Sequence, residues 1–279
     1  ETRCRGKLTL HRWCQWISEY YPNGVYEGEN EKLYDFNESI PGFVTERVVS
    51  PALEEGRLAI ILAEEWHTAE AMCRLSGALS SAGLRDRTLM FWNANNTFSF
   101  HRIDWERLKL CATLTTVSRY MKHLMWGLGL NPLVIPNGIP PRLLRPVRDR
   151  DVRDLRAKLA ADFLLAKVAR WDPAKGWDEA IDAVSRMCTA GWKTTLVTRG
   201  GSEFYGASVI QRAKSLGLTV KAVEMRSGAT NYLTPLTEAG SADIMDLRYP
   251  TPIEFLRVLY RASDAVLANS GHEPFGLVG

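Results

Sequence analysis

The chain of 279 residues exceeds the usual single-domain size of about 100–150 residues, so two domains are expected. Its hydrophobic share of 46% and charged share of 24% exclude a disordered or collagen-like protein. The net charge of +3 comes from interleaved basic and acidic residues, which does not favour nucleic acid as a partner.

No part of the chain predicts a membrane span or a secretion signal. The longest apolar runs, residues 58–63 and 265–268, are far shorter than the roughly 20 residues that cross a bilayer. The first residues lead into an amphipathic segment rather than a continuous apolar core. Five cysteines without a Cys-x-x-Cys pair indicate mostly buried thiols in a reducing compartment. We therefore expect a cytoplasmic protein.

Short apolar segments alternate with amphipathic ones, which is typical of an α/β protein with a mainly parallel sheet. Residues 8–20 predict a helix, because Leu10, Trp13 and Ile17 share one helical face. Residues 28–41 are polar and rich in turn formers, and predict a loop. The chain then predicts strands at 57–63, 88–92, 113–117 and 133–135, and helices at 64–76, 104–112 and 119–126, the last capped by Ser118.

The composition changes at residues 140–156, where three prolines and alternating Arg and Asp residues indicate a connection between domains. Its arginines are interpreted as salt-bridged surface rather than phosphate ligands. The domains are placed at 1–145 and 146–279. The alternation then repeats, with strands at 163–169, 194–198, 218–223 and 265–268, and helices at 151–160, 177–188, 208–216 and 251–261. Thr251 and Glu254 predict a capping box at the start of the last helix.

Two cations follow the strand predicted at 163–169. Arg170 stands at the carboxyl end of this strand, and the loop brings Lys175 back just before the next helix. Ligands of open α/β sheets bind at this end. Two cations beside a helix amino terminus suit a pyrophosphate, although such a pair also fits a solvated loop.

A second polar segment follows the last predicted strand, and residues 269–276 read Asn-Ser-Gly-His-Glu-Pro-Phe-Gly. If a helix begins there, the N–H groups of Phe275 to Leu277 face an anion. Glu273 would enter the same crevice, where a carboxylate can accept hydrogen bonds from sugar hydroxyls. On its own, Glu-Pro-Phe-Gly would be an ordinary turn.

Residues 168–176, 260–264 and 270–279 together resemble the carboxyl-terminal domain of glycosyltransferase family 4 and its glycogen-synthase-like relatives. In that family an Arg and a Lys of the matching loop hold the donor diphosphate. A Glu-x7-Glu motif then contacts the donor sugar and the ribose. Glu273 matches its first Glu, and the second would fall beyond Gly279. The resemblance implies a donor site made of Arg170, Lys175, Gly176, Gly200, His272, Glu273, Pro274, Phe275, Gly276 and Leu277.

The first half carries a matching resemblance. Residues 64–69, Glu-Glu-Trp-His-Thr-Ala, are similar to the His-Asp-Trp-His-Thr-Ala segment of glycogen synthases. His67 matches the second histidine, which lies against the donor sugar there, whereas two glutamates replace the first His and the Asp. Without the resemblance, such a histidine is more often a capping or packing residue. The loop where family members approach the acceptor holds Asn93, Asn95 and Asn96, although clustered Asn is also common in turns.

The resemblance implies the GT-B architecture, an α/β fold of two Rossmann-like domains with mostly parallel sheets facing across a cleft. The domain at 1–145 would be the acceptor side, without the family's first strand, and the domain at 146–279 would bind the donor nucleotide. Both ends are expected to be truncated. Without the second Glu, the chain is expected to bind donor weakly and to turn over poorly, if at all.

The resemblance implies transfer of a sugar from a nucleotide diphosphate sugar to an acceptor hydroxyl, with retention of the anomeric configuration. Such an enzyme would act in carbohydrate metabolism. His67, Arg170, Lys175 and Glu273 would be the catalytic residues. Front-face attack requires no protein nucleophile. Two cations can stabilise the leaving diphosphate without a metal ion, and no cofactor beyond the nucleotide-sugar co-substrate is expected.

Other interpretations stay open. The chain could be a pseudo-transferase that binds a nucleotide sugar or glycan without turnover, or another GT-B enzyme such as a phosphorylase or epimerase. A Rossmann-type oxidoreductase is disfavoured, because no Gly-x-Gly-x-x-Gly follows a strand. Asp149 and Asp151 lie in the charged connection, where a solvated surface is expected rather than a metal site.

The expected partners are a nucleotide-sugar donor and a glycan or small-molecule acceptor. Peripheral membrane association is expected only if the acceptor is a lipid. The sequence does not predict the donor sugar, the base or the oligomeric state.

Overall fold

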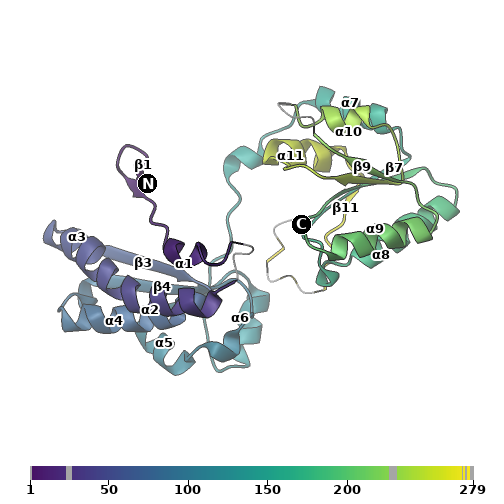
Figure 1. Cartoon of the computed structure of the whole chain (residues 1–279). Helices are drawn as coiled ribbons and strands as arrows, with labels where there is room; N and C mark the ends of the chain where they lie inside the picture. Colours follow the sequence, from purple (N-terminus) through teal and green to yellow (C-terminus); the bar gives the residue numbers. More distant parts are fainter. Residues whose placement is uncertain (1, 23–26, 226–230, 272, 274, 277–279) are drawn as a thin grey trace. The chain divides into compact units, whose positions relative to one another are not determined.

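The computed structural model describes residues 2–22, 27–225, 231–271, 273, 275 and 276. The chain divides into two compact units, residues 1–137 and 138–279 (Figure 1). The sequence placed the boundary at 145/146. Residues 138–145 go with the second unit because the 3-10 helix Pro141–Leu144 packs against α11 (Ile253–Ala262). Arg257 also donates a hydrogen bond to the carbonyl of Arg145.

The first unit is built on a parallel four-stranded sheet with the strand order β3-β4-β5-β6. The strands are β3 (Ala59–Glu64), β4 (Thr88–Ala94), β5 (Thr113–Thr116) and β6 (Leu133–Val134). All four predicted strands are confirmed. Along β4, alternate residues including Met90 and Trp92 are buried, so one face of the sheet faces a core.

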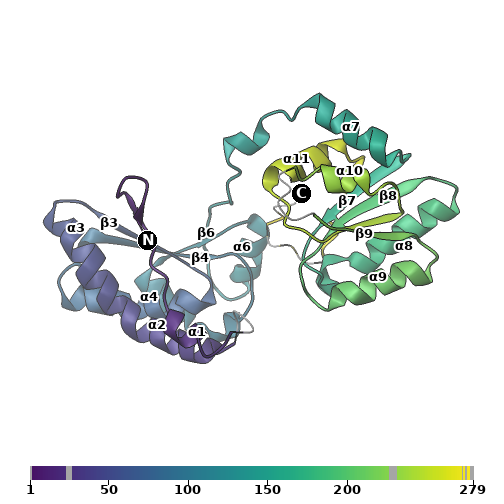
Figure 2. The same ribbon diagram turned by 45° about the horizontal axis from the view of Figure 1, so that its top comes forward.

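The helices of this unit include several that the sequence predicted. The unit contains α2 (Glu29–Val44), the π-helix Thr45–Val49, α3 (Ser50–Glu54), α4 (Ala69–Ser81), α5 (Trp105–Cys111) and α6 (Arg119–Trp126), of which α4, α5 and α6 correspond to predicted helices. Short 3-10 turns lie at Trp66–Thr68, Arg85–Arg87 and Phe100–Arg102. Helices α2 and α4 pack side by side (Figure 2). The predicted cap of α6 is confirmed, because the Ser118 hydroxyl accepts a hydrogen bond from the Met121 N–H at 3.1 Å.

Two predictions near the amino terminus are wrong. Residues 8–20 form strand β2 (Leu8–Thr9), which pairs with β1 (Thr2–Arg3), and only the single turn α1 (Gln15–Ser18), because Cys14 takes a left-handed conformation at its start. The segment predicted as a loop at 28–41 lies almost entirely in α2. Its polar start includes glutamates that favour a helix amino terminus, and packing against α4 stabilises the helix.

The second unit is built on a parallel five-stranded sheet with the order β11-β7-β8-β10-β9. The strands are β7 (Phe163–Val168), β8 (Thr194–Arg199), β9 (Val220–Val223), β10 (Ile244–Leu247) and β11 (Ala265–Val266). The sequence did not predict β10, although it is fully buried. An aspartate interrupts its four-residue run, and Asp246 is accommodated by an ion pair with Arg248 at 3.0 Å.

Helices cover both faces of this sheet (Figures 1 and 2). They are α7 (Asp149–Leu159), α8 (Trp177–Thr189), α9 (Tyr205–Ser215), α10 (Thr234–Glu238) and α11, with a 3-10 turn at Pro173–Lys175. One core lies beneath α7, α10 and α11 and includes Leu155 and Leu259, and the other lies beneath α8 and α9 and includes Ile181 and Val209.

Two local predictions in this part differ from the structure. The capping box at Thr251 is not formed, because Pro252 is the N-cap of α11 and no side chain caps the helix. The five cysteines have free thiols, but Cys73 alone is buried, so the expectation of mostly buried thiols is wrong.

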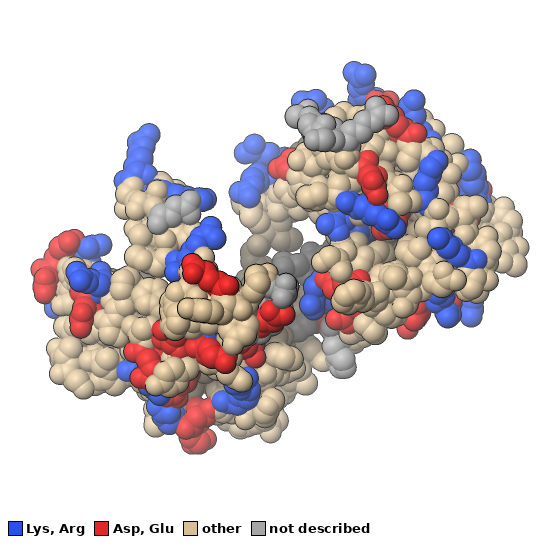
Figure 3. Space-filling model, in the orientation of Figure 1, with Lys and Arg blue, Asp and Glu red and all other residues tan. Residues whose placement is uncertain are grey.

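The described residues show neither a membrane-crossing helix nor a charged stripe of one sign on the visible face. None of their helices is long and apolar enough to cross a membrane. Basic and acidic side chains are interspersed over the face of each unit that Figure 3 shows.

Candidate functional site

The carboxyl edge of the second sheet brings together the loops that the sequence singled out. Because β7, β8, β10 and β11 are parallel, the segments that follow them leave the sheet at one edge. The loop after β7 carries Arg170 and Lys175, and the loop after β11 carries Glu273. The Gly271 N–H donates to the Ala174 carbonyl at 3.0 Å, which joins the two loops directly.

Lys175 and Glu273 form an ion pair at the centre of this edge. The lysine Nζ lies 2.9 Å from Oε2 of Glu273, and their side chains are 22% and 41% exposed. Lys175 ends the 3-10 turn that Asp172 caps by accepting from the Ala174 N–H at 2.8 Å. The capped turn therefore fixes the backbone of Lys175, and both charged side chains are partly exposed, within reach of a ligand.

Arg170 differs from Lys175 because its guanidinium is mostly in solvent. Its side chain is 68% exposed, and its ion pair with Asp172 has an N–O distance of 4.0 Å. The backbone of Arg170 is held more firmly, since its carbonyl accepts from the Trp177 indole N–H at 2.8 Å. The guanidinium is thus free to turn toward an anion from a fixed point.

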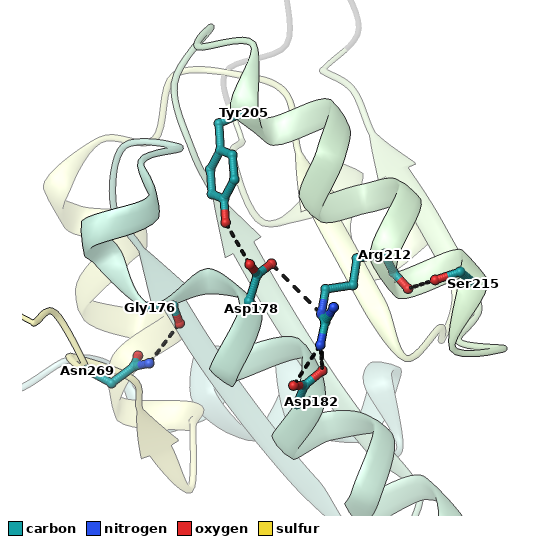
Figure 4. Close-up of polar contacts among 7 residues, drawn as sticks. All are labelled: Gly176, Asp178, Asp182, Tyr205, Arg212, Ser215 and Asn269. Atoms are coloured by element: carbon teal, nitrogen blue, oxygen red, sulfur yellow. Dashed lines mark hydrogen bonds and ion pairs between the residues drawn. The ribbon is translucent and has the colours of Figure 1, made fainter.

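Lys167 of β7, a buried residue that sequence reasoning missed, is connected to both loops through Asn269. Lys167 is 1% exposed and donates to Oδ1 of Asn269 at 2.5 Å and to the Leu267 carbonyl at 3.3 Å. Asn269 in turn donates to the Gly176 carbonyl at 2.7 Å (Figure 4). The pKa of Lys167 is lowered to about 8, chiefly by burial; the charge of Glu179 opposes this fall and the charge of Lys175 adds to it.

Gly176 has a clear structural reason for being glycine. Its φ is +64°, and a Cβ there would lie 2.4 Å from the side-chain nitrogen and the carbonyl oxygen of Asn269. The close approach of the two loops therefore requires a residue without a side chain. Its direct contact with a donor stays a prediction.

Gly200 also has a packing role. A Cβ on Gly200 would lie 2.0 Å from the indole nitrogen of Trp171, and one on Gly206 would lie 2.6 Å from the same ring. Trp171 is buried and stacks on Trp177 with ring centroids 4.0 Å apart. This packing accounts for the glycine at 200, and the predicted donor contact of Gly200 is not tested.

An open pocket of about 780 Å³ adjoins this edge beside Trp171. Its walls come from the end of β8, the first turns of α9 and the end of β10, and they include Arg199, Glu203 and Arg248. The volume is within the range of ligand pockets. Sequence reasoning missed this pocket because it did not predict β10, and only a recognised strand there could have pointed to it.

Part of the predicted site lies outside the described residues, namely His272, Pro274 and Leu277. Phe275 and Gly276 are described and lie in irregular structure, with a φ of +79° at Gly276. The expected helix amino terminus at 275–277 and its anion-binding N–H groups therefore stay a prediction.

His67 belongs to the first unit and follows β3. Its Nε2 lies 3.2 Å from Oε1 of Glu29, and its ring lies against Trp66 with centroids 3.9 Å apart. The side chain is 41% exposed, so the ring has both a fixed orientation and an open face.

The asparagine loop predicted to approach an acceptor forms hydrogen bonds with Glu64 and Glu65, the glutamates that precede His67. The carboxylate of Glu65 accepts from the Asn95 N–H at 3.2 Å and from the Asn96 side chain at 2.9 Å. Glu64 accepts from the Asn95 side chain at 3.2 Å, and Asn93 donates to Asn95 at 3.0 Å. Burial raises the pKa of Glu65, while the hydrogen bonds from Asn96 and Asn95 oppose this rise. These bonds show a structural role for the loop, and the acceptor role stays a prediction.

In the part of the chain that the structure describes, no three His, Cys, Asp or Glu side chains gather as metal ligands would. Asp149 and Asp151 lie in the first turn of α7.

The sequence matches no protein-family model and no curated protein, whereas solved structures share its fold. The catalytic domain of starch synthase IV from Arabidopsis thaliana, bound to ADP and acarbose, has a TM-score of 0.58 at 14% identity, over 90% of this chain and 58% of that one. A UDP-forming α,α-trehalose-phosphate synthase from Burkholderia vietnamiensis has a TM-score of 0.59 at 13% identity, over 95% and 62%. HepE from Anabaena, in complex with UDP and glucose, has a TM-score of 0.52 at 20% identity, over 82% and 58%.

These similarities show the fold. Each unit is an α/β unit with a parallel sheet, and together the units match the Rossmann-like GT-B architecture that the sequence predicted. The chain spans about three-fifths of the length of the structures it resembles.

Proposed function

We propose that this chain is part of a glycosyltransferase that takes a sugar from a nucleotide diphosphate sugar. The observation that carries the proposal is the joined pair of loops at the carboxyl edge of the second sheet, where Lys175 and Glu273 meet at 2.9 Å. Support comes from the fold, since structures of this architecture are described in complex with ADP or with UDP.

The two cations would stabilise the leaving diphosphate. As the bond between the anomeric carbon and the phosphate oxygen breaks, negative charge develops on that oxygen. Lys175 would exchange its ion pair with Glu273 for a phosphate oxygen, and Arg170 would turn from solvent onto the same group. Glu273, released from the lysine, would accept hydrogen bonds from the sugar hydroxyls. In this mechanism the protein's own cations supply the positive charge and no metal ion is required.

The transfer itself would proceed with retention by attack on the same face. The acceptor oxygen forms the new bond to the anomeric carbon, and its proton passes to the departing phosphate oxygen. No protein nucleophile takes part. His67 would orient the donor sugar, and the pocket beside Trp171 would hold the nucleoside.

The test is calorimetric titration of the chain with ADP and UDP in buffer containing EDTA. We expect Lys175→Ala to weaken the affinity about 10- to 100-fold, since a charge-assisted hydrogen bond is worth roughly 1.5–3 kcal/mol. Lys193→Ala is the matched control, because Lys193 is exposed and precedes β8 at the opposite edge of the sheet. Equal affinities for Lys175→Ala and the unmodified chain would rule out this diphosphate site.

A second assay separates an enzyme from a binding module. The chain is incubated with a panel of nucleotide sugars and candidate acceptors, and release of nucleoside diphosphate is measured. Release that Lys175→Ala abolishes supports transfer. Binding without release, measured on a protein extended past Gly279, would favour a non-catalytic module.

A further inference from the structure

Two of the five cysteines, Cys73 and Cys111, lie on neighbouring helices of the first unit. Cys73 belongs to α4, and Cys111 is the last residue of α5. The two helices follow β3 and β4, which are parallel, and they pack against each other. They therefore run in the same direction, and successive turns of one helix lie beside successive turns of the other.

A charged pair fixes the register of the two helices. Arg107 of α5 donates a hydrogen bond to the Glu70 carboxylate of α4 at 2.9 Å. Cys73 stands one turn after Glu70, and Cys111 stands one turn after Arg107. Because residues three or four positions apart share a helix face, the next turn of each helix places the two cysteines at the same contact.

A second arginine holds the end of α5 against α4. The Arg85 guanidinium donates to the Ser76 hydroxyl at 3.1 Å and to the Cys111 carbonyl at 2.8 Å. Ser76 stands one turn after Cys73 in α4. Charged and polar contacts therefore connect the two helices on both sides of the cysteine pair.

The two thiols interact with each other but differ in their access to solvent. The pKa of Cys73 is raised to about 12, chiefly by burial and then by its charge interaction and side-chain hydrogen bond with Cys111. Cys73 is 8% exposed, whereas Cys111 is partly exposed and lines an open pocket of about 540 Å³. A small oxidant therefore has better access to Cys111 than to Cys73.

We propose that Cys73 and Cys111 are a redox-sensitive pair, which hydrogen peroxide closes to a disulfide between α4 and α5. The Cys111 sulfur attacks a peroxide oxygen, the O–O bond breaks, and Cys111 becomes a sulfenic acid as water leaves. The Cys73 sulfur then attacks the Cys111 sulfur, the S–O bond breaks, and the departing hydroxide takes the Cys73 proton to form a second water. Two thiols are oxidised and one peroxide is reduced. The pair lies outside the proposed diphosphate site, so it does not depend on the transfer reaction.

Peptide mapping of the oxidised chain tests the proposal. The folded chain is treated with hydrogen peroxide, its remaining thiols are blocked with N-ethylmaleimide, and it is digested with trypsin without reduction. Cleavage after lysine and arginine releases peptides 58–74 and 110–119, each with one cysteine. We expect these peptides as one cross-linked species that has lost two hydrogen atoms and that dithiothreitol separates. The same oxidation in urea should lose this preference among the five cysteines, because the helices are then unfolded.

Variants assign the role of each thiol. Cys73→Ala and Cys111→Ala should abolish the cross-link, whereas Cys188→Ala, the matched control in the second unit, should retain it. In Cys73→Ala the sulfenic acid of Cys111 should accumulate and react with dimedone. The proposal would be overturned by a folded, unmodified chain without the cross-link, by cross-links spread equally over the five cysteines, or by a cross-link between two copies at doubled mass on a non-reducing gel.

Discussion

Replacing the buried Lys167 with methionine tests how the second unit tolerates a charge in its core. Burial lowers the pKa of Lys167 from the ordinary 10.5 to about 8. A pKa difference of one is worth about 1.4 kcal/mol, so holding the ammonium in the folded state costs about 3 kcal/mol at neutral pH. Lys167→Met removes this cost but leaves Asn269 and the Leu267 carbonyl without their donor, at about 1–3 kcal/mol each. The two effects nearly cancel at pH 7.

The pH dependence separates these effects. Between the folded pKa of about 8 and the unfolded value of 10.5, the unfolded chain binds more protons than the folded one, so stability rises with pH. Between pH 7.5 and 9.5 the unmodified chain should therefore gain about 2 kcal/mol relative to Lys167→Met. Below pH 7 both folded and unfolded states are protonated, and the difference between the two proteins stays constant.

Urea unfolding followed by circular dichroism, with one transition fitted to each unit, measures this gain. Carbon-13 resonances of the lysine side chains give the pKa of Lys167 directly, assigned by the signal that Lys167→Met lacks. Lys193→Met is the control, since Lys193 is exposed. The free energy of unfolding of this variant should change with pH as that of the unmodified chain does. If the free energies of unfolding of Lys167→Met and the unmodified chain changed with pH in parallel, the argument that burial destabilises the Lys167 ammonium would be refuted.

Two further predictions concern packing and capping. Gly200→Ala should destabilise the second unit by about 1–3 kcal/mol, because its Cβ would overlap the Trp171 indole. Gly77→Ala is the control: Gly77 lies in an open position of α4, so this substitution should be neutral or stabilising. Urea unfolding of both variants measures the difference. Ser118→Ala should cost the first unit about 1 kcal/mol by removing the cap on the Met121 N–H; Ser118→Asp should restore it, and equal midpoints for all three proteins would contradict the capping role.

Local patterns predicted most of the central elements. The strands of the first sheet follow from short apolar segments, and the cap at Ser118 follows from the preference of serine for a helix start. The same reasoning failed for α2, whose polar first turns resemble a loop until α4 packs against them. It also missed β10, because Asp246 interrupts the apolar run of this buried strand. In the structure the Asp246 carboxylate is compensated by its ion pair with Arg248.

The sequence by itself determined the α/β alternation, the family resemblance and the order of Arg170, Lys175 and Glu273 along the chain. Tertiary structure alone decided that Lys175 meets Glu273, 98 positions away, and that Lys167 supports both loops through Asn269, 102 positions away. Helix and strand preferences act over a few residues, whereas these contacts depend on which strands become neighbours in a sheet and which helices pack together.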